Sequence, residues 1–157
     1  MSNMQQLAKY ARLLSLRKSV LERERSGALR EAQAMRRQID ALRAANVALR
    51  LEIDALYSLA CDQGKQGKTP GPVPLEMRLG IAAALQDRLK ESEEEIEEIE
   101  AGRADAETRA NSVGAKLSIL RTKVTTIDEK LRVLKQKALL LAELRLEDEL
   151  PALRRQC

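Results

Sequence analysis

The side chains best suited to chemistry in this chain are two cysteines, Cys61 and Cys157. The 157 residues include no histidine, so neither cysteine has the partner that a Cys-His nucleophile or a mixed zinc site requires. The two cysteines also form no CxxC pair. We therefore expect no catalytic thiol, no bound metal and no cofactor, and the lack of nucleophile–base pairs argues against an enzyme.

The stretch GKQGKT at residues 64–69 resembles a phosphate-binding loop in composition. It lacks the GxxxxGK spacing and a preceding strand, so we expect no nucleotide site there. Pro70, Pro72 and Pro74 follow it, and proline removes a backbone donor and clashes inside a helix. We interpret residues 63–74 as a tip loop between two helices.

Composition favours long helices over a globular core. The chain has no Phe or Trp and only two Tyr, while 33% of its residues are charged. Abundant Leu, Ala, Gln and Ser are typical of coiled coils. No stretch has the length and apolar character of a transmembrane helix, and residues 1–20 contain no signal-peptide core. These residues are basic and amphipathic like a transit peptide, but their apolar positions are in phase with those of the next heptads, so we expect a cytosolic protein without direct membrane insertion.

The charge distribution is uneven. The net charge is +4, yet residues 91–110 hold nine acids against two arginines. A nucleic-acid binder is one alternative, and it predicts strongly salt-dependent binding to duplex DNA. Basic residues are spread among acids, however, with no aromatic platform and no known reader motif. We therefore expect no nucleic-acid partner.

Apolar residues recur at seven-residue spacing in the first half of the chain. With each heptad lettered a to g, column d begins at Leu7 and column a at Met4, and both continue in steps of seven. Apolar residues fill 14 of these 17 positions. The exceptions are Lys18, Arg25 and Asn46. So long a pattern predicts a coiled-coil helix over about residues 3–62.

The second half repeats this pattern from Leu75, at alternating steps of three and four residues. Apolar residues fill 17 of its 21 core positions. We expect a helix over about residues 75–150, with Pro74 at its first position. Pro151 is expected to mark its end and to leave residues 151–157 as a tail.

A loop centred near residue 69 predicts that the two helices pack antiparallel. The residue numbers of two core positions that face each other then add up to about 138. This register places Asn46 opposite Ser92, the one small polar residue of the second column. A slip of one heptad would set the Asn46 amide against a leucine or isoleucine, at a cost of about 1–3 kcal/mol. We therefore interpret Asn46 and Ser92 as the register-setting core, and the fold as an all-α antiparallel coiled-coil hairpin.

Charges at positions e and g flank this core and predict pairs between the helices. The expected pairs are Arg36 with Glu100, Arg43 with Glu93, Glu31 with Arg109, Glu24 with Lys116, and Glu52 with Arg88. Only Arg17 and Lys123 form a like-charged pair. A parallel homodimer would stack the core cations Lys18, Arg25 and Arg103 on their own copies, so the hairpin is favoured.

The register leaves the residues from Ala138 onward without a partner in the first helix. This C-terminal helical overhang, ALLLAELRLEDELPALRRQC, carries leucines on more than one face. An unpartnered apolar helix end marks a docking or self-association site. Fraying or folding back is the other interpretation.

Two segments of the chain carry a resemblance to a known family, the opening LAKYARLLSLRKSVLERE, residues 7–24, and the closing ELRLEDEL, residues 143–150. A hairpin with these two ends resembles the stalk proteins of type III secretion and flagellar export, the FliJ/YscO-like family. That family is similar to the two-helix axle of the rotary ATPase gamma subunit. The resemblance implies a non-enzymatic central stalk that links a hexameric secretion ATPase to an export-gate membrane protein. Chaperones are a further class of partner that it allows.

The resemblance also implies where the contacts lie. The paired termini would contact the ATPase ring, and the tip side would face the export gate at the inner membrane. The implied ring contacts are Arg12, Arg17, Leu140, Leu144 and Leu146, and the implied gate contacts are Tyr57 and Leu79. The alternative function is a coiled-coil scaffold or tether that self-associates through its C-terminal overhang.

Overall fold

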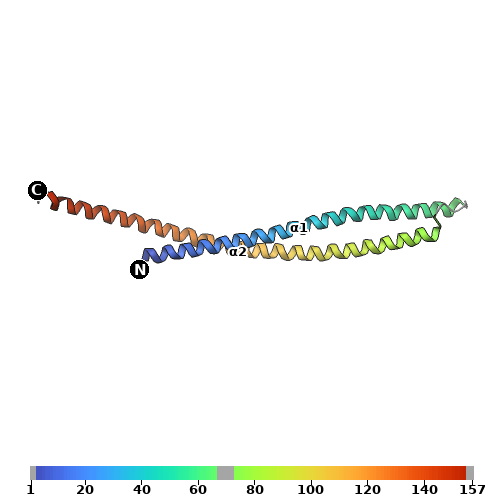
Figure 1. The fold of residues 1–157 in the computed structure, drawn as a ribbon, viewed down its shortest axis with the longest axis horizontal. Coiled ribbons are helices and arrows are strands. Elements are labelled where there is room, and N and C mark those ends of the chain that lie inside the picture. The colour runs from blue at the N-terminus through green and yellow to red at the C-terminus, as the bar shows by residue number, and fades with distance from the viewer. Residues whose placement is uncertain (1–2, 67–72, 155–157) are drawn as a thin grey trace. The chain divides into compact units, whose positions relative to one another are not determined.

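The computed structural model describes the backbone of residues 3–66 and 73–154 and the side chains of residues 3–62 and 73–147. Two helices account for almost all of this part of the chain, α1 over Asn3–Gln66 and α2 over Leu75–Arg154 (Figure 1). The described residues contain no strand. The fold is an all-α helical hairpin, as the two heptad columns predict.

Helix α1 ends four residues later than expected, at Gln66 instead of residue 62. Gly64 lies inside the added turn, where glycine costs about 1 kcal/mol relative to alanine without stopping a helix. The expected tip loop is therefore shorter on this side. Pro70 and Pro72, which we assigned to that loop, lie outside the described residues.

Helix α2 begins at Leu75, and Pro74 immediately precedes it. The carbonyl oxygen of Pro74 accepts hydrogen bonds from the amides of Met77 and Arg78, at 3.1 and 3.2 Å. Pro74 is thus the N-cap residue, one position before the site we expected for it.

The expected end of α2 at Pro151 is wrong, because the helix continues to Arg154. Proline costs one backbone hydrogen bond and a clash with the preceding turn, but it does not stop the helix here, and the residues beyond it complete a last turn. Of the expected tail, residues 151–154 are therefore helical. Cys157 lies outside the described residues.

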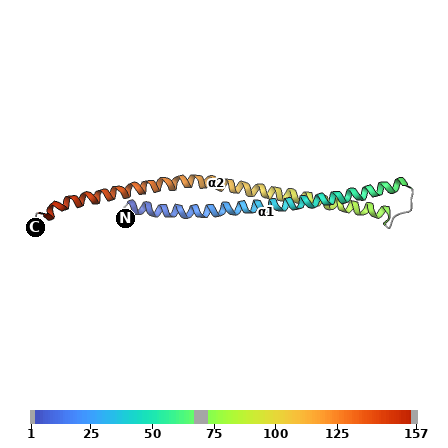
Figure 2. The ribbon, with the colours of Figure 1, turned by 90° about the horizontal axis from the view of Figure 1, so that it is seen from above.

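The chain divides into two compact units, and each contains a segment of both helices. The terminal unit comprises residues 1–26 and 110–157, and the loop unit comprises residues 27–109. Within each unit, the α1 and α2 segments run antiparallel and lie side by side (Figures 1 and 2). Each unit therefore has its own part of the two-helix core.

Burial follows the predicted columns. Every buried side chain in the described part of the chain lies at position a or d. The buried residues are Leu14, Ala28, Ala32, Ile39, Asn46, Ile53, Ala82, Ile96, Ala106, Ala110, Val113, Leu117, Leu120 and Ile127. Because a two-helix core has only one contact face per helix, the heptad pattern alone determines which side chains are buried.

The core of the terminal unit contains residues from both predicted columns. Its core is built from Leu14, Leu120 and Ile127, with Ala11, Leu21, Val124 and Leu131 packed against them. The register placed Leu14 opposite Val124, and both residues belong to this cluster. The core of this unit is therefore built from positions a and d of both helices.

Two helical glycines offer a direct test of how helix propensity limits stability. A Cβ atom at Gly27 or Gly80 would meet nothing within 4 Å. We expect Gly27→Ala and Gly80→Ala each to raise the free energy of unfolding by about 0.5–1 kcal/mol, because alanine loses less backbone entropy in a helix. Urea unfolding followed by circular dichroism measures the change.

Gly114 provides the matched control for these substitutions. A Cβ atom there would lie 3.3 Å from Nε of Arg25, so the arginine side chain must shift. Gly114→Ala should therefore stabilise the chain less than Gly27→Ala. Equal gains at all three glycines would show that the Arg25 side chain moves aside without cost.

Candidate functional site: a basic groove and a leucine-rich overhang

The overhang of α2 is exposed on all sides. Every described side chain from Lys135 to Glu147 is exposed, and the red end of α2 runs on beyond the start of α1 in Figures 1 and 2. Five leucines in this stretch keep between 56% and 65% of their surface accessible. They are Leu139, Leu140, Leu141, Leu144 and Leu146. So much exposed leucine on one helix segment is typical of a surface that binds another protein.

The overhang leucines lie on different faces of the helix. Leu140 is at position c and Leu144 at position g, four residues apart, so their side chains are neighbours on one face. Glu143 and Glu147 border the same face. We call these four residues the acidic ridge. Leu139 and Leu146, both at position b, lie on another face.

An apolar groove lies next to the core of the terminal unit. One open cavity of about 340 Å³ is lined by residues from both helices, and a second of about 420 Å³ adjoins it. The two cavities share Tyr10, Ile119 and Lys123. The remaining lining residues are Leu14, Arg17, Leu21, Lys116, Leu120, Thr122, Thr126 and Ile127. We call this continuous surface the basic groove.

The basic groove carries three cations and no acid among its lining residues. Arg17, Lys116 and Lys123 make none of the ion pairs found in the described part of the chain. The expected pair of Lys116 with Glu24 is absent from these side chains. The predicted like-charged pair, Arg17 with Lys123, lines one cavity. The groove therefore presents uncompensated positive charge around an apolar floor.

The structure brings together only some of the residues that we expected to contact an ATPase ring. Arg17 lines the basic groove, whereas Arg12 is exposed at position b and does not line it. Leu140, Leu144 and Leu146 are all exposed on the overhang. Sequence reasoning missed Lys116, Ile119, Thr122, Lys123 and Thr126 as a joint surface. The like-charged pair was the one signal that pointed to it.

The two expected gate contacts lie in the loop unit. Tyr57 on α1 and Leu79 on α2 are both exposed, and both occupy position e of their heptads. Further exposed apolar side chains of this unit are Leu59, Leu75, Met77 and Ile81. Tyr57 and Leu79 therefore lie on the e side of the core, whereas Leu59 and Ile81, at position g, lie on the other side.

The register-setting residues lie in the core of the loop unit, but they are not hydrogen-bonded. Asn46 is 5% exposed, and it lines an open cavity together with Glu93 and Ile96, the neighbours of Ser92. The Oδ1 atom of Asn46 and the Oγ atom of Ser92 both lack a hydrogen-bond partner. Asn46 Oδ1 and Ser92 Oγ are thus both buried without a hydrogen bond, so the bond that would satisfy the Asn46 amide is missing.

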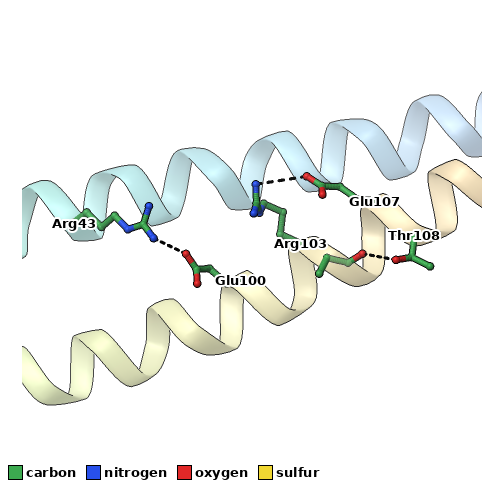
Figure 3. A network of polar contacts seen from close by, with 6 residues as sticks. Arg43, Glu100, Arg103, Glu107 and Thr108 are labelled. Carbon is green, nitrogen blue, oxygen red and sulfur yellow. Dashed lines mark hydrogen bonds and ion pairs between the residues drawn. The ribbon is translucent and has the colours of Figure 1, made fainter.

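Ion pairs join the helices on both sides of the core. Figure 3 shows Arg43 on α1 reaching Glu100 on α2 in the loop unit. The other pairs between the helices are Arg50 with Glu93 at 2.6 Å, Glu31 with Arg109 at 3.0 Å, and Glu22 with Arg121 at 3.1 Å. The prediction of Glu31 with Arg109 is confirmed. The side chains of Glu52 and Arg88, both described, form no pair.

The predicted pairs of Arg36 with Glu100 and Arg43 with Glu93 are wrong by one heptad. Each Cα–Cβ bond tilts toward the N-terminus of its own helix, so side chains on antiparallel helices lean in opposite directions. Arg43 and Glu100 lean toward each other, whereas Arg43 and Glu93 would lean apart. The heptad position thus predicts on which side of the core a charged side chain lies. The tilt of the side chain determines which residue along the opposite helix it pairs with.

One cation at a core position forms an ion pair within its own helix. Arg103, at position a of α2, pairs with Glu107 across 3.5 Å (Figure 3). Its Nε atom is buried without a hydrogen-bond partner. Figure 3 also shows Thr108, whose hydroxyl donates to the carbonyl of Ala104 at 2.9 Å.

Comparison with known proteins identifies no relative. No protein-family model, curated protein or solved structure matches the chain. Neither α1 nor α2, over its described residues, is long and apolar enough to cross a membrane. The described side chains also contain no group of three or more acidic or cysteine residues placed to hold a metal ion.

Proposed function

We propose that the chain is the non-enzymatic central stalk of a type III protein secretion apparatus, with its terminal unit inserted in a hexameric secretion ATPase. The observation that carries this proposal is the leucine-rich overhang beside a pair of antiparallel helices. The resemblance of residues 7–24 and 143–150 to export stalk proteins supports it. A helix end with several exposed leucines suits insertion into the apolar lumen of a protein ring.

In this proposal, leucines supply most of the binding energy. Burying one leucine side chain contributes about 1.5–3 kcal/mol, so Leu140, Leu144 and Leu146 together could anchor the stalk. Arg12 and Arg17 would favour a ring surface of negative potential and speed association. The loop unit, through Tyr57 and Leu79, would face the membrane export gate. The proposed location is the cytoplasmic face of the inner membrane.

Stimulation of the cognate secretion ATPase tests the function. The purified full-length chain should raise the rate of ATP hydrolysis, and truncation before Ala138 should abolish the increase, because the overhang leucines are then lost. A chain that never stimulates the ATPase contradicts the function. A truncated chain that stimulates normally contradicts the assignment of the overhang to the ring.

A matched variant in the loop unit distinguishes the role of that unit from the role of the overhang. Tyr57→Ala combined with Leu79→Ala removes exposed apolar side chains, as the truncation does, but from the other unit. This variant should stimulate ATP hydrolysis like the wild type while it lowers protein export in cells. Loss of ATPase stimulation in this variant would show that the loop unit also contacts the ring.

A scaffold or tether that self-associates through the overhang is the second candidate. It is favoured by one observation, the presence of exposed leucines on more than one face of the overhang. A gene for a secretion ATPase beside the gene for this chain would favour the stalk. Normal secretion in a strain that lacks the chain would favour the scaffold.

A further inference from the structure

The basic groove has a shape and charge suited to an acidic amphipathic helix. Its floor is apolar, and Ile119, which lies between the two cavities, is 61% exposed. Arg17, Lys116 and Lys123 line it without acidic partners. A helix that fits such a surface needs leucine-like side chains on one face and carboxylates beside them.

The acidic ridge of the overhang has this chemistry. Leu140 and Leu144 are exposed on one face, and Glu143 and Glu147 border them. Glu143 and Glu147 take part in no ion pair among the described side chains. Between Leu140 and Glu147 the one cation is Arg145, at position a on the opposite face, whereas Lys137, at position g, lies one turn before Leu140 on the ridge side. The ridge and the groove are therefore complementary in both apolar surface and charge.

The ridge cannot reach the groove of its own chain. Helix α2 runs unbroken from the groove through the overhang. Ile119 and Leu140 are separated by 21 residues of continuous helix, which span about 32 Å at 1.5 Å per residue. Only a second molecule can bring an overhang to the groove.

The ridge and the groove also lie on the same face of α2. The groove uses positions c, d, f and g of α2, and the ridge uses positions c, f and g. One two-fold axis can therefore bring both ridges against both grooves at once. Such a dimer is closed and leaves no ridge free to recruit a third copy.

We propose that two copies of this chain form a reciprocal dimer, in which the acidic ridge of each terminal unit occupies the basic groove of the other. This inference is independent of the proposed function, because it concerns the purified chain alone. It adds a regulatory consequence to that function. The dimer covers Arg17, Leu140 and Leu144, so a dimeric chain would be unable to enter an ATPase ring.

Sedimentation velocity of the full chain tests the dimer, with the cysteines kept reduced. The wild type should convert from monomer to dimer between micromolar and submillimolar concentration. Leu140→Ala combined with Leu144→Ala should raise the dissociation constant by about a hundredfold, because two central apolar contacts are lost. The matched control, Leu139→Ala with Leu146→Ala, removes equally exposed leucines from another face and should leave it unchanged.

A charge exchange tests the pairing of ridge with groove. Lys116→Glu with Lys123→Glu, and separately Glu143→Lys with Glu147→Lys, should each raise the dissociation constant by about tenfold or more. Combining all four substitutions in one chain should restore the dimer. A monomer at every concentration overturns the proposal. A dimer that responds to the leucine variants but to neither charge reversal shows pairing between overhangs, and this also overturns it.

Discussion

Replacing Leu117 with alanine should lower the free energy of unfolding by about 2–4 kcal/mol. Leu117 is the largest fully buried side chain among those that the structure describes, at 1% exposure, and lies at position a of α2 in the terminal unit. The substitution removes apolar contacts and leaves a cavity that two helices can close only in part. Urea unfolding followed by circular dichroism measures the loss.

The control for Leu117→Ala is the same substitution at an exposed site of the same unit. Leu16 is 65% exposed, at position f of α1, so Leu16→Ala should change stability by less than about 0.5 kcal/mol. Similar losses at the two leucines would contradict the assigned heptad phase. A small loss at Leu117 alone would mean that the helices close the cavity.

The fold was predictable because burial in a helical hairpin is a local property of each helix. Each helix meets one neighbour, so the columns that start at Leu7 and Met4 already determine which side chains face inward. The ends of the helices were less predictable. Pro151 costs a backbone hydrogen bond and a clash with the preceding turn, so the sequence predicts a helix end there, yet the helix passes it.

The charge pairs show what heptad letters leave out. They identified the side on which Arg43 meets α2, and they missed that it leans toward Glu100 instead of Glu93. The basic groove was missed for a related reason. The groove is basic because no carboxylate among the described side chains pairs with Lys116 or Lys123. The predicted register had paired Glu24 with Lys116. The predicted like-charged pair of Arg17 and Lys123, which line one cavity, was therefore more informative than the predicted attractive pairs.

Replacing Asn46 with isoleucine should raise the free energy of unfolding by about 1–3 kcal/mol. Asn46 is buried at a core position, and its Oδ1 atom has no hydrogen-bond partner. Isoleucine removes this unsatisfied acceptor and adds apolar surface at a position that favours it in coiled coils. The control is Asn111→Ile, at an exposed position b, which should change stability by less than about 0.5 kcal/mol. A loss of stability in Asn46→Ile would show that the amide is satisfied in solution.

The same substitution should make the fold less specific. The sequence predicts that Asn46 and Ser92 oppose a heptad slip, because Ser92 gives the amide a small polar neighbour, whereas a slip sets it against leucine or isoleucine. With isoleucine at position 46, slipped hairpins and assemblies of several chains lose this penalty. Sedimentation velocity should then resolve species that the wild type does not form. If Asn46→Ile is more stable and forms only the wild-type species, the charge pairs, such as Arg43 with Glu100, are sufficient to fix the register.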